Sequence, residues 1–301
     1  MLACLTGETG RDTKTVLLKK LKRIMLPYLV FSILYPVIDI TYYYVTGNGD
    51  PFASLRQNIY DSLVLYGNSV LWFLPTAFFG DILFFIIIKT AMRLSKKYAS
   101  YITVFVTLAA SLVLCLVFGH RNGHLIVAVV RFFPAAFFVS MGNLIFSLMQ
   151  NRIPKRAVSA AAGILCMAVL YFIHGLNGTV DMHFGVYGNP VLYLVNALIG
   201  SMGVILISMA VDPGEKKTPL CIIEFYGKNS LFVMITHINF YILYCAEVLS
   251  FKIISYIPRA KDLIFNFMTV LFVLAAEFVL IKMYEIGKMK IVSKKSGNRI
   301  R

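Results

Sequence analysis

Eight apolar runs, most of them about twenty residues long, follow one another along the chain and are separated by short polar segments. A run of this length is sufficient to cross the hydrocarbon core of a bilayer as an α-helix. Inside that core every backbone N–H and C=O must be hydrogen-bonded within the protein, so a spanning segment is a helix or part of a closed barrel. Barrel strands alternate in hydrophobicity over about ten residues. The sequence therefore predicts an all-α, polytopic membrane bundle.

The composition agrees with this class. The 301 residues are 59% hydrophobic and only 14% charged, whereas soluble domains are about half apolar and about a quarter charged. A membrane bundle with about eight transmembrane helices is therefore expected. The predicted spans are Ile24–Val45, Val70–Ile88, Tyr98–Phe118, Leu125–Met149, Ala157–Ile173, Val191–Val211, Ile222–Leu249 and Leu263–Tyr284.

The positive charge follows the predicted topology. The formal net charge is +15, which in a soluble protein suggests nucleic-acid binding. Here 22 Lys and Arg residues fall on one side of the spans and 5 on the other, which places both termini in the cytoplasm. We expect a plasma-membrane protein that contacts anionic lipid and binds no nucleic acid. It has a cytoplasmic basic segment (residues 1–23), one membrane-embedded domain (24–285) and a basic tail (286–301).

Ionisable side chains at membrane depth are costly and usually have a function. Arg131 lies inside the fourth span and keeps its charge, so it requires a carboxylate, backbone carbonyls or water. Asp81 and Asp39 are candidate partners. Arg131 either anchors the bundle or orients a polar group of a substrate. The complete set is Asp39, Asp81, Arg131, Glu224, Lys228, His237, Glu247 and Glu277.

The seventh span carries most of the other polar groups. The helical spacing of Ser230, His237, Tyr241 and Tyr244 predicts that they share one face, which either lines a polar path or only fixes helix packing. Glu224 and Lys228 are spaced to form an ion pair.

A basic run of four residues precedes the first span. It is either a topology signal or a phosphate-binding cluster, and it consists of Lys19, Lys20, Lys22 and Arg23. The outer loops contain several histidines, but the chain has no HExxH, CxxC or EF-hand pattern. We therefore expect no metal site.

Five blocks together resemble the acyltransferase-3 family of membrane O-acyltransferases, and most closely its fucose-4-O-acetylase-like branch. Each block alone is only weakly specific for this family, but the order and spacing of the five blocks together are more specific for it. They are KKLKRIMLPYLVFSIL, LWFLPTAFFGDILF, VVRFFPAAFFVSMGNLI, YGNPVLYLVNALIGSMGVILIS and EFYGKNSLFVMITHINF.

The resemblance implies transfer of an acetyl group from acetyl-CoA to a hydroxyl of a sugar or cell-envelope polysaccharide. The basic run would hold the CoA phosphates, while Arg131, Trp72, Asp81 and His237 would bind or position the substrate. No bound cofactor is expected. Family members have ten spans and a catalytic His in the first, and no residue here matches that His. We therefore expect an N-terminally truncated chain whose catalytic residue is unassigned and which is potentially inactive.

Two other classes remain open. A transporter or flippase of a lipid-linked or small polar substrate would also place Arg131, Asp81 and His237 along a route through the membrane. Such proteins commonly contain two-fold internal repeats, and we detect none. A non-catalytic membrane partner in envelope assembly is the third option.

Overall fold

The computed structural model describes residues 13–47, 49–119, 123–149, 155–211, 218–254 and 261–297. This part of the chain is almost entirely helical, with an isolated antiparallel bridge between Asp181 and Val186. Among the described residues, seven helices are long and apolar enough to cross a membrane, or eight if a bent pair counts as one span. The predicted all-α membrane bundle is confirmed.

The chain forms two compact units, and each is described by itself. The first unit comprises Met1–Pro36 and Asp50–Glu215, and the second comprises Val37–Gly49 and Lys216–Arg301. The boundary falls within helix α3 (Leu26–Thr46), directly after Pro36. A proline inside a helix removes one backbone hydrogen bond and favours a kink.

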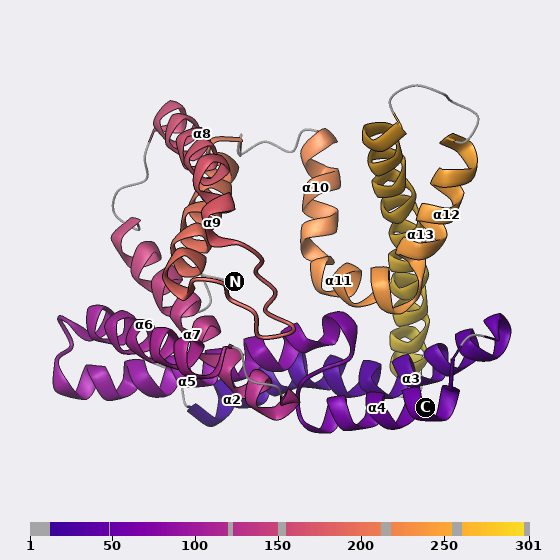
Figure 1. Ribbon diagram of the computed structural model, residues 1–301, viewed down its shortest axis with the longest axis horizontal. Helices are drawn as coiled ribbons and strands as arrows, with labels where there is room; N and C mark the ends of the chain where they lie inside the picture. Colours follow the sequence, from indigo (N-terminus) through magenta and orange to yellow (C-terminus); the bar gives the residue numbers. More distant parts are fainter. Residues whose placement is uncertain are drawn as a thin grey trace. The chain divides into compact units, whose positions relative to one another are not determined.

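The first unit contains the spans that were predicted most closely. Helices α5, α6 and α7 pack together, and α8 and α9 run along each other (Figure 1). Helix α4 begins at Pro51, where Asp50 caps it by accepting from the N–H groups of Phe52 and Ala53. The α-helices that lie wholly within this unit are α2 (Thr13–Lys20), α4 (Pro51–Leu63), α5 (Phe73–Leu94), α6 (Ala99–Phe118), α7 (His124–Met149), α8 (Arg156–Ile173) and α9 (Pro190–Val211).

Small and hydroxylated side chains mark the contacts between these helices. On α6, Thr103, Thr107 and Ser111 recur every fourth residue and are buried. The Thr107 hydroxyl lies 2.8 Å from the Ser140 hydroxyl on α7. The hydrophobic effect does not bring apolar helices together in lipid. Close packing and interhelical hydrogen bonds stabilise their contact instead. A polar stripe therefore identifies the inner face of α6.

Close backbone approach joins α8 to α9. A Cβ added at Gly163 would lie 3.0 Å from the backbone nitrogen of Ile207 and 3.1 Å from the carbonyl oxygen of Gly203. Glycine at position 163 therefore allows the two helices to approach more closely than any other residue would.

The second unit departs from the sequence prediction. Span seven, expected as one helix over Ile222–Leu249, is divided into α10 (Thr218–Lys228), α11 (Ser230–Asn239) and α12 (Ile242–Ile254). The break after Asn239 bends the path by 67°, and Tyr241 adopts a left-handed φ of 56°. Helix α12 packs along α13 (Lys261–Gly297), which contains the last span.

Candidate functional site

The basic run lies within the first helical span of the structure. That span runs from Leu17 to Val45, and it contains a π-helical segment, Leu21–Met25. The N–H of Leu26 bonds to the carbonyl of Leu21. Such wider turns are rare and frequently occur at functional sites.

Lys20 forms an ion pair with Asp81 of α5. The Lys20 ammonium lies 2.8 Å from Asp81 Oδ2, and the Asp81 side chain is only 4% exposed. One expected phosphate-binding residue is therefore brought together with one expected substrate-binding residue. The remaining basic side chains of the run, Lys19, Lys22 and Arg23, are exposed.

Arg131 of α7 is completely buried, with 0% exposure. Its Nη2 donates to the carbonyl of Tyr66 at 2.9 Å and to that of Leu65 at 3.4 Å, and Nη1 donates to the carbonyl of His183 at 3.4 Å. Of the expected partner types, backbone carbonyls are therefore the ones observed. Arg131 connects two loops, one before α5 and one before α9.

Aromatic rings surround this guanidinium. The Arg131 Cζ lies 5.1 Å from the ring centre of Tyr66 and 5.2 Å from that of Trp72, within the range of cation–π attraction. The His183 ring lies 4.8 Å from Tyr66 and is stacked on Trp72 at 6.2 Å between centres. We call Arg131, Tyr66, Trp72 and His183 the aromatic cluster.

Several polar atoms in and beside the aromatic cluster are buried. Arg131 Nε, His183 Nε2 and the Tyr187 hydroxyl have no hydrogen-bond partner among the described residues. Burial lowers the pKa of His183, and the nearby charge of Arg131 lowers it further. Burial raises the pKa of Tyr66. At neutral pH the cluster therefore contains one fixed positive charge, a neutral imidazole and a neutral phenol.

A histidine–carboxylate pair adjoins the cluster. His124 Nδ1 contacts Asp61 Oδ1, and the amide of Gln57 donates to the same carboxylate oxygen at 3.0 Å. The Tyr66 ring stacks on His124 with 4.0 Å between centres. The sequence alone did not identify Asp61 or Tyr66, because both lie in a polar segment outside the spans.

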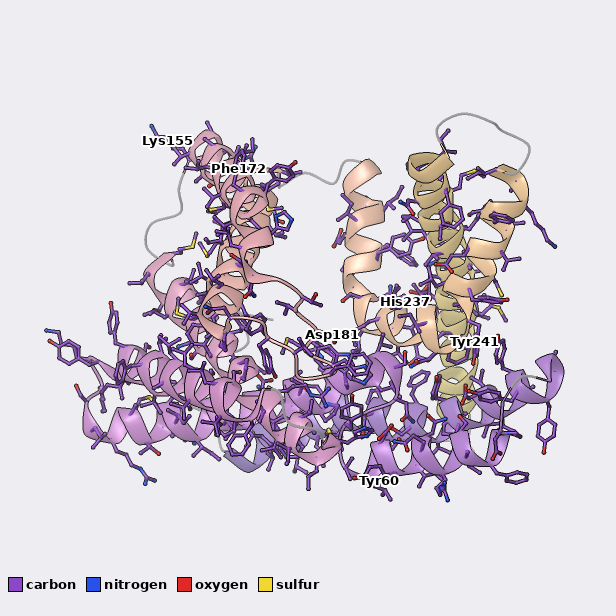
Figure 2. All side chains as sticks on the ribbon, viewed as in Figure 1. Tyr60, Lys155, Phe172, Asp181, His237 and Tyr241 are labelled. Atoms are coloured by element: carbon purple, nitrogen blue, oxygen red, sulfur yellow. The ribbon has the colours of Figure 1, made fainter. Side chains whose placement is uncertain are left out.

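His237 belongs to the second unit, on α11 (Figure 2). Its Nδ1 lies 2.8 Å from the carbonyl oxygen of Val233. The predicted shared face of Ser230, His237, Tyr241 and Tyr244 is wrong, because α11 ends at Asn239 and the chain turns before Tyr241. Tyr241 instead donates to Asp39 at 3.0 Å and stacks on Tyr42.

The expected pair between Glu224 and Lys228 is present at 2.6 Å, and both side chains are exposed. Among the described residues, no group of three or more His, Cys, Asp or Glu side chains could hold a metal ion.

The family described as "Acyltransferase domain" (Acyl_transf_3) matches residues 1–281. The chain belongs to this acyltransferase-3 family. Comparisons with curated proteins and with solved structures give no match. The fucose-4-O-acetylase-like branch and the truncated N-terminus stay predictions.

Membership of the acyltransferase-3 family establishes a membrane acyltransferase domain. Of the residues expected from the resemblance, the structure brings Arg131 to Trp72 and Lys20 to Asp81. It also adds His183 and Tyr66 to the first pair. Sequence reasoning missed the contacts of Tyr66 and His183 with Arg131, because their loops carry no periodic signal.

Proposed function

We propose that the protein is a plasma-membrane O-acyltransferase that transfers an acetyl group from acetyl-CoA to a hydroxyl of a sugar or cell-envelope polysaccharide. The match to the acyltransferase-3 family over residues 1–281 carries this proposal. The donor phosphates bind at the exposed cations Lys19, Lys22 and Arg23, because clustered cations suit a polyphosphate. The Lys20–Asp81 pair is the polar group next to them inside the bundle.

The aromatic cluster is the acceptor-binding part of the proposal. Sugar rings have apolar faces that pack on Trp and Tyr rings, while their hydroxyls bond to nearby polar atoms. Trp72, which is only partly buried, offers such a ring, and Tyr66, Arg131 and His183 lie beside it. His237 and Asp81 are further substrate-contacting candidates. The general base that removes the acceptor proton has no assignment among these residues.

The test uses membranes from cells that express the chain, supplied with acetyl-CoA labelled in the acetyl group. The expected result is label in the glycan fraction. Trp72→Ala should reduce this label more than 10-fold while Trp72→Phe retains most of it, because only the second keeps an aromatic face. Lys22→Gln with Arg23→Gln should raise the KM for acetyl-CoA, and Lys155→Gln is the matched control. Absence of glycan label with folded wild-type protein would contradict the proposal.

A further inference from the structure

The second unit contains a buried carboxyl group that the acyl-transfer proposal does not use. Glu277 lies on α13, about 20 Å along the span that begins at Ile264, and its exposure is 0%. A carboxylate at such a place is very unfavourable unless it is paired with a cation or well supplied with donors.

Within the described part of the chain, the hydrogen bonds to the Glu277 carboxyl group come from one hydroxyl. Thr236 Oγ1 lies 2.8 Å from Glu277 Oε1, 2.9 Å from Oε2 and 2.8 Å from the carbonyl oxygen of Phe232. A threonine hydroxyl has one proton to donate. When that proton goes to the Phe232 carbonyl, as is common for Thr inside a helix, the bond to Glu277 requires a proton on the carboxyl group.

Among the described residues, the charged and titratable groups near Glu277 do not supply a bonded cation. His237 of α11 is close enough to Glu277 to interact with it electrostatically, but its Nδ1 bonds to the carbonyl of Val233. Lys282 of α13 pairs with Glu285 at 2.8 Å. The Tyr226 hydroxyl of α10 donates to the carbonyl of Leu274, and Glu247 of α12 is exposed.

A second observation comes from Asn239, three residues after Thr236 on α11. Residues three apart on a helix are neighbours on one face, and both are buried. Asn239 is 1% exposed, and neither its Nδ2 nor its Oδ1 has a partner among the described residues. On this face of α11, directly before the helix break, buried polar atoms therefore outnumber the hydrogen-bond partners that the described residues supply.

We propose that Glu277 is a proton-binding site within the membrane-spanning part of the second unit, in which the neutral carboxyl donates to Thr236 and Asn239 provides the adjacent polar group. The ligand of the site is a proton, exchanged at the Glu277 carboxyl. Buried carboxyl groups on transmembrane helices serve such a role in proton relays. The inference does not depend on acyl transfer.

Infrared spectroscopy of the full-length protein in lipid nanodiscs at pH 7.5 tests the site directly. An ordinary glutamate is protonated in fewer than about one in a thousand molecules at this pH. With ¹³C-labelled glutamate, the expected spectrum contains the isotope-shifted carbonyl band of a protonated acid. The band is lost in Glu277→Gln and kept in the matched control Glu247→Gln. Wild-type protein without this band overturns the proposal, whatever the variants do.

Reaction with dicyclohexylcarbodiimide provides a second readout. The carboxyl proton is transferred to a carbodiimide nitrogen while the carboxylate oxygen bonds to its central carbon, so only the protonated acid starts the reaction. Where water is excluded, the adduct rearranges to a stable N-acylurea that mass spectrometry locates. Modification at Glu277 at least 10-fold above that at Glu285 is expected at pH 7.5. Equal, background modification of the two residues counts against a neutral Glu277.

Discussion

Arg131 shows how one buried side chain holds two loops. Its contacts reach residues 65 and 52 positions away in the sequence, and they satisfy carbonyls that have no strand or helix to bond them. The presence of Arg131 in a span was evident from the sequence, but its partners were not, because any backbone carbonyl is an acceptor and nothing in the sequence distinguishes Tyr66 from its neighbours.

Replacing Arg131 by Met should lower the free energy of unfolding by about 3 kcal/mol, because buried carbonyls lose their donors. Thermal unfolding in detergent measures the change. Arg156→Met is the matched control, since Arg156 is exposed at the start of α8, and its effect should be within about 0.5 kcal/mol. Equal losses in the two variants would argue against an anchoring role for Arg131.

His183 should make stability depend on pH. Its pKa is lowered in the folded protein by burial and by the charge of Arg131, while in the unfolded chain it is about 6.5. Between these two values the unfolded state binds more protons, so the free energy of unfolding falls as the pH drops below about 6.5.

The measurement for His183 is the thermal midpoint at pH 7.5 and at pH 5.5. Wild type should lose more stability than His183→Gln over this range. His174→Gln, which changes an exposed histidine, should behave as wild type. If His183→Gln shows the same pH dependence as wild type, the lowered pKa of His183 does not contribute to it.

At the scale of elements, the length of an apolar run predicted the presence of a helix well. It did not predict whether that helix is continuous. Seven predicted spans coincide with described helices that are long and apolar enough to cross a membrane, because about twenty apolar residues have few alternatives to such a helix. The break between α11 and α12 was missed because Asn239, Phe240 and Tyr241 include neither Pro nor Gly, the usual local signals. Tertiary contacts hold Tyr241 in its left-handed conformation, including its bond to Asp39 and its stacking on Tyr42.

The contact between α8 and α9 should be sensitive to a single methyl group. Gly163→Ala places a Cβ against the backbone of α9, and overpacking of this kind costs about 1–3 kcal/mol. Gly175→Ala is the control, because nothing lies within 4 Å of the added Cβ. The measurement is the unfolding midpoint of the two variants and of wild type. An unchanged midpoint for Gly163→Ala would show that α8 and α9 can move apart to accept the methyl group without loss of stability.

At the scale of the whole molecule, the asymmetry of 22 against 5 basic residues predicts the orientation of the chain in the membrane. Single cysteines introduced into a cysteine-free variant test it. An impermeant maleimide added to intact cells should label Val180→Cys, in the loop before α9, and should label Lys155→Cys, before α8, only after permeabilisation. The reverse pattern would place both termini outside.

The polar contacts of the first unit also impose an order on its biosynthesis. Lys20 and Asp81 are 61 positions apart, Asp61 and His124 are 63 apart, and Tyr66 and Arg131 are 65 apart. At ordinary elongation rates, such a separation takes roughly 3–13 s to synthesise. The earlier member of each pair therefore leaves the ribosome seconds before its partner exists. The guanidinium of Arg131 completes its own set of carbonyl contacts only when the segment containing His183 arrives, so a nascent chain stalled before that point presents an unfinished first unit to the cell's quality control.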